Sequence, residues 1–266
     1  HMHARGAGAG RDIGGDALLA IYAGTRYAPH APALQIHATH RGGLLEKRGS
    51  DYRFTHLSLQ EFLTARYLAT VTLAEGGIEA AAGFFEPDKA AESWWREVAL
   101  LIPGYFVATS NAASAVAFLR RLSGLTRSAT APRLSADARL ASAELAATAA
   151  LELLGTDSDL KAALADLIRR IYDDKSTMVG TRARNRVRAG VALGKLGDPR
   201  DEVMHVDAMR ICVVPDGPFY MSTDDDSGSD DRERSEPLIR DIPYTYGVGE
   251  YTITNSQFQE FCDDGG

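Results

Sequence analysis

His56 is the residue of this chain whose type and position most directly suggest chemistry. It lies two residues before Ser58, in the stretch FTHLSLQE at positions 54–61. Ser58 and Glu61 have the spacing of a capping box, which marks the start of a helix. The free N–H groups and the dipole at such a start favour an anion, so His56 is a candidate donor to a phosphate. The alternative is a structural histidine whose ring bonds to a nearby backbone carbonyl.

Four arginines form the second candidate site. Arg182, Arg184, Arg186 and Arg188 make two i,i+4 pairs on a helix predicted over residues 182–196. Residues 201–266 hold 16 acidic and 4 basic side chains, whereas the rest of the chain is net positive. The arginines therefore form either a solvated face or a docking site for the acidic segment DDDSGSDDRERSE at 224–236.

The other candidate sites are incomplete. Cys212 and Cys262 have no metal-ligand spacing, and His37 and His40 have no apparent third ligand, so no metal site is expected. The glycine-rich stretch GAGAGRD at 6–12 lacks the lysine and hydroxyl of a phosphate loop and predicts a flexible linker. We therefore expect no catalytic residue and no cofactor in this chain. It should not bind or hydrolyse ATP alone.

Composition limits the class of protein. Of 266 residues, 45% are hydrophobic and 24% are charged, which is typical of a soluble chain with about two domains or one domain and a repeat array. The longest apolar stretch, around 98–108, is interrupted by Pro103 and Gly104 and is too short to cross a membrane. Basic residues are not interleaved with aromatics, so nucleic acid is not an expected partner. The low cysteine content favours a reducing compartment, and we expect a cytoplasmic location.

The hydrophobic pattern predicts how these residues are positioned. A hairpin over 44–47 and 52–54 follows the end of a short helix at 35–39 and precedes the helix from Ser58, whose Phe62 and Leu63 should face the core. Further helices are predicted over 94–107, 111–122, 135–154, 157–172 and 182–196. The segments AATAALELLG (146–155) and RAGVALGKLG (188–197) share an ending, and their last glycines lie 42 residues apart. That period is typical of HEAT-type helical pairs.

The acidic end has a different pattern. A strand over 210–214, a turn at 215–217 and a short returning strand at 219–221 are followed by strands over 239–242 and 244–253. A second capping box, Thr254 to Gln257, opens a helix. A few strands and one helix cannot close a core of their own, so this module is expected to be truncated.

Two family resemblances add to this interpretation. The stretch FTHLSLQEFL at 54–63, followed by Ala65 and Tyr67-Leu68-Ala69, resembles the end of the winged-helix domain of NACHT-type STAND ATPases. In that family the histidine matching His56 touches the phosphates of bound ADP. The resemblance implies that His56 acts only with an upstream NACHT ATPase domain, where ADP or ATP would be the cofactor.

The second resemblance lies near the end of the chain. VVPDGPFYM (213–221), Ser235-Glu236-Pro237 and YTITNSQF (251–258) with Phe261 resemble the beginning of the formylglycine-generating-enzyme (sulfatase-modifying factor) domain, which has a C-type-lectin-like fold. That family's oxidases use copper and a cysteine pair near the end of the domain. Cys212 and Cys262 do not lie at the matching places, so catalysis is not implied.

The resulting prediction is a mainly α chain followed by a small α+β segment. The expected domains are a tag or linker at 1–14, which opens on a His-Met pair typical of a cloning scar, a winged-helix remnant at 15–75, a HEAT-like array at 76–200 and an incomplete lectin-like domain at 201–266. The expected function is the non-catalytic sensor region of a bacterial STAND signalling protein. Its lectin-like end would bind a protein or small ligand, as in ligand-binding proteins diversified by retroelements. The alternatives are part of an oxidase whose catalytic residues lie outside this chain, and a HEAT-like scaffold.

Overall fold

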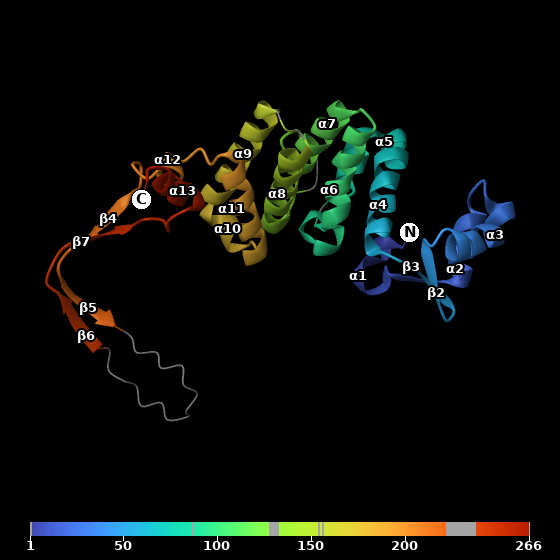
Figure 1. Ribbon diagram of the computed structural model, residues 1–266, viewed down its shortest axis with the longest axis horizontal. Helices are drawn as coiled ribbons and strands as arrows, with labels where there is room; N and C mark the ends of the chain where they lie inside the picture. Colours follow the sequence, from blue (N-terminus) through green and yellow to red (C-terminus); the bar gives the residue numbers. More distant parts are fainter. Residues whose placement is uncertain are drawn as a thin grey trace, which may run out of the picture. The chain divides into compact units, whose positions relative to one another are not determined.

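The chain is mainly helical and ends in a small part with antiparallel strands and a helix, as the sequence predicts. The computed structural model describes residues 2–86, 88–127, 133–153, 155, 157–221 and 238–265. It divides into two compact units, His1–Gly197 and Asp198–Gly266 (Figure 1). The units are described separately below.

The first unit begins with a small three-stranded sheet and short helices. These elements are η1 (His3–Arg5), α1 (Gly6–Ala9), β1 (Asp12–Gly14), α2 (Gly15–Ala23), η2 (Ala28–His30), α3 (Ala31–Ile36), η3 (His37–Arg41), β2 (Leu45–Arg48) and β3 (Asp51–Phe54). The predicted hairpin is confirmed, and Gly49 adopts the positive φ of 64° that its two-residue turn requires. The strand order is β1–β3–β2 and both pairs are antiparallel.

The flexible linker predicted at the start of the chain is wrong. Asp12–Gly14 pairs with β3 as a strand, and Arg53 of β3 donates to the Asp12 carboxylate through Nε (2.7 Å) and Nη2 (2.5 Å). Met2 and Ile13 are buried with Leu18, Leu45 and Tyr52 in a small core. A sequence pattern reports only the local preference of a glycine-rich stretch. Here pairing and burial with residues about 40 positions away override that preference.

Helices make up the rest of this unit. They are α4 (Leu57–Tyr67), η4 (Leu68–Thr72), α5 (Leu73–Gly83), η5 (Lys89–Ala91), α6 (Ser93–Ala108), α7 (Ala112–Ser123), α8 (Ala136–Leu153), α9 (Ser158–Asp173), α10 (Lys175–Val179) and α11 (Ala183–Leu196). Helices α4, α6, α8 and α11 pack in sequence as one layer, and α5, α7 and α9 form a second layer (Figure 1). The sequence placed the start of the helical array at residue 76. Because α4 and α5 pack on α6 and α7, the stack begins earlier, at α4.

Helix α8 lies at the centre of the stack and is buried on nearly every side. Leu145 and Ala149 join one hydrophobic core with α6 and α7, whereas Leu140, Ala143 and Ala147 join a second core with α9 and α11. The many alanines of α8 allow close approach of helices α6, α7, α9 and α11. Because these side chains are small, one helix can contribute residues to both cores.

Most predicted helix starts in the stack are confirmed. The Asn111 and Asp157 side chains accept hydrogen bonds from Ser114 N (3.2 Å) and Leu160 N (2.9 Å), and Ser135 Oγ accepts one from Ala138 N (3.1 Å). Helix α6 continues through Pro103 to Ala108 rather than ending there. These caps are set by hydrogen bonds within one turn, so a local pattern is sufficient to find them.

Helix α4 differs from its prediction in two ways. It begins at Leu57 with His56 as the N-cap residue, so Ser58 lies inside the first turn and forms no capping box. Phe62 and Leu63 are 42% and 38% exposed, whereas Gln60, Ala65, Leu68 and Ala69 are buried. Apolar residues occur on more than one face of this helix, so spacing alone does not identify the buried face.

The second unit consists of α12 (Asp201–Met204), β4 (Ile211–Val214), β5 (Gly217–Met221), β6 (Leu238–Ile242), β7 (Tyr246–Gly249) and α13 (Asn255–Asp263). Strand β4 pairs with β7 and β5 pairs with β6, both antiparallel. The prediction that residues 219–221 pair with residues 210–214 is therefore wrong. Residues 215–217 bend the chain but do not reverse it, so β5 pairs with β6 and not with β4. Part of the resemblance segment, Ser235-Glu236-Pro237, lies outside the described residues.

Polar contacts organise much of this unit. The capping box of Thr254 and Gln257 is confirmed in both halves. Gln257 is buried and donates through Nε2 to the Glu202 carbonyl at 3.0 Å, and Thr254 Oγ1 donates to the Val203 carbonyl at 2.7 Å. Val203 is the one buried hydrophobic residue among the described residues of the unit. The expectation that these elements do not close a core of their own is consistent with this.

Candidate functional site

His56 occupies the exposed N-cap position of α4. Its backbone is extended, with φ −129° and ψ 135°, and its side chain makes no capping hydrogen bond to the helix. The alternative of a histidine whose ring bonds to a nearby backbone carbonyl therefore does not apply, because the His56 ring has no hydrogen-bond partner among the described residues. Glu61, on the next turn, does not reach back to cap the helix, and burial together with the charge of Glu97 raises its pKa. His56 is accessible to a ligand or domain that approaches the start of α4.

The four arginines do not act as one group. Arg182 is the N-cap residue of α11, and its backbone N (2.8 Å) and Nε (2.5 Å) both donate to the carboxylate of Asp137 on α8. The guanidinium of Arg186 points back to the Thr181 carbonyl at 2.6 Å. Arg182 and Arg186 therefore hold the start of α11 in place.

Arg184 and Arg188, by contrast, line a cavity of about 300 Å³. Neither has a hydrogen-bond or ion-pair partner among the residues that the structure describes. Ser93 and Asn185 share the lining, together with Ala91 and Arg182. The sequence identified the arginines of this site but not Ser93 or Asn185. Ser93 lies on α6, about 90 positions before the arginines, so sequence spacing does not connect it to them.

The acidic segment 224–236 lies outside the described residues. Its docking to the arginines therefore stays a prediction, and Arg182 and Arg186 are already engaged within the first unit.

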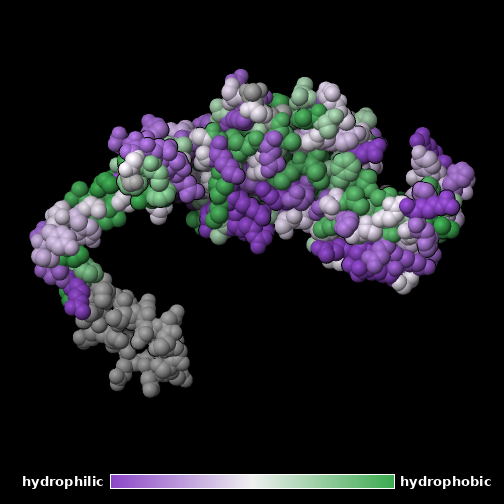
Figure 2. Space-filling view, in the orientation of Figure 1, coloured by the Kyte–Doolittle hydropathy of each residue, from purple (hydrophilic) through white to green (hydrophobic). Residues whose placement is uncertain are grey.

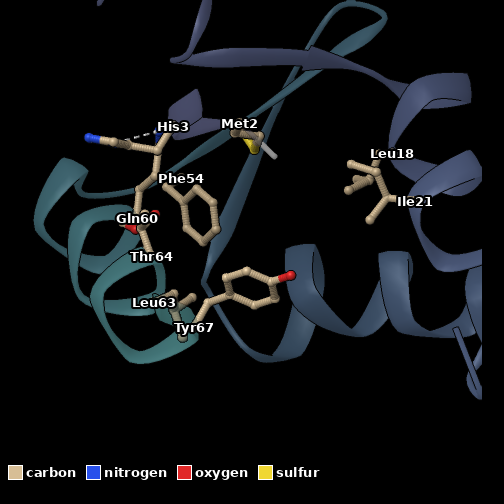
Figure 3. Close-up of a pocket in the computed structure, with 9 residues that line it drawn as sticks. All are labelled: Met2, His3, Leu18, Ile21, Phe54, Gln60, Leu63, Thr64 and Tyr67. Carbon is tan, nitrogen blue, oxygen red and sulfur yellow. Dashed lines mark hydrogen bonds between the residues drawn. The ribbon is translucent and has the colours of Figure 1, made fainter. Parts of the chain in front are cut away.

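A second cavity, of about 250 Å³, is mostly apolar and separates α4 from α2. Figure 3 shows Leu63, Thr64 and Tyr67 of α4 on one side and Leu18 and Ile21 of α2 on the other. Tyr67 is 55% exposed. Leu63, which was expected to face the core, thus borders this cavity.

His3 borders the same cavity but is committed to the fold. Its ring stacks on Trp94 with centroids 4.3 Å apart, and its Nε2 donates to the Trp94 carbonyl at 2.9 Å. Gln60 Nε2 donates to His3 Nδ1 (3.3 Å) and to the Gly10 carbonyl (2.8 Å), so the neutral ring carries its proton on Nε2. Burial lowers the pKa of His3, and the hydrogen bond to Trp94 offsets only part of this effect. The ring is therefore neutral at pH 7 and joins the chain start to α4 and α6.

The described residues offer neither a metal site nor a membrane-spanning helix. The described residues contain no group of three or more His, Cys, Asp or Glu side chains arranged to hold a metal ion. Cys212 and Cys262 are both free and exposed. No helix in the described part of the chain is both long enough and apolar enough to cross a membrane.

Comparisons with protein-family models, with curated proteins and with solved structures return no match. The functional interpretation therefore rests on the motifs and geometry of this chain.

Proposed function

We propose that this chain is the non-catalytic sensor region of a NACHT-type STAND signalling protein that acts in the cytoplasm. The observation that carries the proposal is the connectivity around His56. Helices α2 and α3 lie between β1 and the β2–β3 hairpin, the sheet order is β1–β3–β2, and α4 follows with His56 at its start. This order of elements is that of a winged-helix domain, which the motif at 54–69 resembles.

The surface of α4 supports an adjoining domain. Phe62, Leu63 and Tyr67 are 42%, 38% and 55% exposed on the helix that begins at His56. Exposed large apolar side chains gathered on one element are typical of a surface that another domain or protein covers. In this proposal the upstream ATPase domain covers α4, and His56 contacts the phosphates of its bound ADP.

The stacked helices support a HEAT-like spacer. The segments 146–155 and 188–197, which share the ending A-L-x-x-L-G, begin within α8 and α11. These two helices are neighbours in the same layer. Equivalent positions in successive repeats are expected to be stacked in this way. The spacer transmits a binding event between the two ends of the protein.

The second unit is proposed as the lectin-like end that binds a protein or small ligand. Large hydrophobic side chains on its strands and on α13 are exposed, and Figure 2 shows such residues along the ribbon. These include Ile211, Val213, Ile239, Phe258 and Phe261, each at least 54% exposed. A surface of this kind is stabilised when further residues of the domain or a partner cover it.

The role of His56 is testable in the protein that contains this chain together with its ATPase domain. His56→Ala is expected to speed ADP release about tenfold, the effect of losing one charge-assisted hydrogen bond to a phosphate. Release is measured with fluorescent ADP chased by unlabelled ADP. The chain alone should give no heat with ADP in calorimetry.

Ser58→Ala is the matched control, because Ser58 is exposed near the same helix start and makes no capping bond. It should leave ADP release unchanged. Tight ADP binding by this chain alone, or unchanged release from the His56→Ala protein, would contradict the proposal.

A further inference from the structure

The cavity between the starts of α6 and α11 has the features of an anion site. It has a volume of about 300 Å³ and is lined by Ala91, Ser93, Arg182, Arg184, Asn185 and Arg188. Arg184 and Arg188 lie one turn apart on α11, so their side chains are neighbours on the helix surface. Like charges at this spacing repel each other unless an anion lies between them. We propose that this cavity binds a phosphate-bearing anion.

The lining of the cavity carries three arginines, and the Asp137 carboxylate that contacts one of them is already neutralised. Asp137 accepts from Arg182 N (2.8 Å), Arg182 Nε (2.5 Å) and Asn185 Nδ2 (2.8 Å). This pairing also uses the charge of Arg182. Arg184 and Arg188 then contribute two positive charges that no described residue compensates. A phosphate monoester carries a charge of about −1.5 to −2 at pH 7, which matches them.

The backbone adds donors on both sides. Ser93 is the first residue of the 16-residue helix α6, and Arg184 is the second residue of the 14-residue helix α11. The first N–H groups of a helix have no partner within it, and the helix dipole favours negative charge there. The cavity is thus lined by residues from two helix starts, which include a serine and two arginines without a described partner.

A phosphate fits these donors better than the side chains of the acidic segment 224–236. Arginine guanidiniums bind phosphate through two parallel hydrogen bonds, and one phosphate offers enough oxygens for both arginines and Ser93 together. Docking of the acidic segment was predicted from all four arginines. Two of them are held by Asp137 and Thr181.

The test is calorimetric titration of the full chain with inorganic phosphate and, separately, with a phosphoserine peptide. A Kd of about 1 mM or tighter is expected for one of the two at low salt, with weakening as salt is added. Tighter binding of the peptide assigns the site to phosphorylated chains, and tighter binding of inorganic phosphate assigns it to the free anion. An absence of saturable binding for both would overturn the proposal.

Variants locate the binding. The double variant Arg184→Gln/Arg188→Gln is expected to weaken binding at least tenfold, and Ser93→Ala, which removes one hydroxyl, about threefold. Arg169→Gln/Arg170→Gln on α9 removes the same charge from residues outside the cavity and should change the Kd less than twofold. Equal weakening by both double variants would show general charge attraction and would overturn the assignment. Circular dichroism checks that each variant is folded.

A last variant separates phosphate from the acidic segment. Asp224, Asp225, Asp226, Asp230 and Asp231 are replaced together by asparagine. If the segment occupied the cavity, this change would strengthen phosphate binding severalfold, and that result would overturn the proposal. An unchanged Kd supports it.

Discussion

Replacing Phe118 by alanine is expected to lower the free energy of unfolding of the His1–Gly197 unit by about 4 kcal/mol. Phe118 is 0% exposed, and its ring packs edge-on against Phe85 and Phe106 with centroids 6.3 Å away in each case. Alanine removes both ring contacts and leaves a cavity that the surrounding helices only partly fill. Denaturant unfolding measures the change.

The chain offers a selective probe and matched controls. Both tryptophans, Trp94 and Trp95, lie in this unit, so their fluorescence follows its unfolding. Phe118→Leu should cost about 1.5 kcal/mol because most of the volume is kept. Phe62→Ala, at a side chain 42% exposed, should cost about 1 kcal/mol or less. A cost for Phe62→Ala equal to that of Phe118→Ala would mean that the core is assigned to the wrong helix faces.

The place of Phe118 in one of the two cores also indicates how a local loss of packing would affect the rest of the stack. Phe118 belongs to the core shared by α4 to α9, whereas Ala189 and Leu193 of α11 belong to the second core. In a stack of repeats each element contacts mainly its neighbours, so a local loss spreads through shared helices. Here α8 is the shared helix. A stack that transmits a signal requires this kind of connection.

Local signals in the sequence predicted local structure well. The caps at Asn111, Asp157 and Thr254 depend on hydrogen bonds to residues three positions away, and each was found from residue type and spacing. The box at Ser58 failed because the chain enters α4 two residues earlier, at His56. A capping pattern is therefore not sufficient to locate a helix start, and helices such as α4 and α11 begin without a capping side-chain bond.

Contacts between distant residues were not predictable in the same way. The pairing of β4 with β7 rather than β5 joins residues 32 to 38 positions apart, and buried His3 contacts Trp94, 91 positions away. At the arginine site the sequence contains four similar candidates. Asp137, 45 residues before Arg182, and the Thr181 carbonyl, which accepts from Arg186, separate the two structural arginines from the unpaired ones.

The cost of removing Asp137 is the second large effect that the structure predicts. Asp137→Ala should lower the free energy of unfolding by about 3 kcal/mol, the low end for breaking a buried ion pair. The buried Asn185 amide loses its acceptor and cannot reach water, which makes the change costly. Arg182, whose side chain is 64% exposed, can be solvated instead, which limits the cost.

The contribution of the Asp137 carboxylate to stability depends on pH in a direction set by its lowered pKa. Burial raises the pKa of Asp137, but hydrogen bonds from Arg182 and Asn185 outweigh this effect and hold the pKa below its usual value of 3.8. The ionised carboxylate therefore stabilises the fold above about pH 4, and this contribution is lost as the pH falls through the lower folded-state value. The difference between wild type and Asp137→Ala should be constant from about pH 5 to 8 and should shrink below pH 4.

Asp166→Ala is the control for this experiment, because Asp166 pairs with Arg169 and Arg170 on an exposed face of α9. It should cost less than about 1 kcal/mol and become smaller still in high salt. A cost of Asp137→Ala no larger than that of Asp166→Ala would show that the junction of α8 and α11 does not depend on this carboxylate.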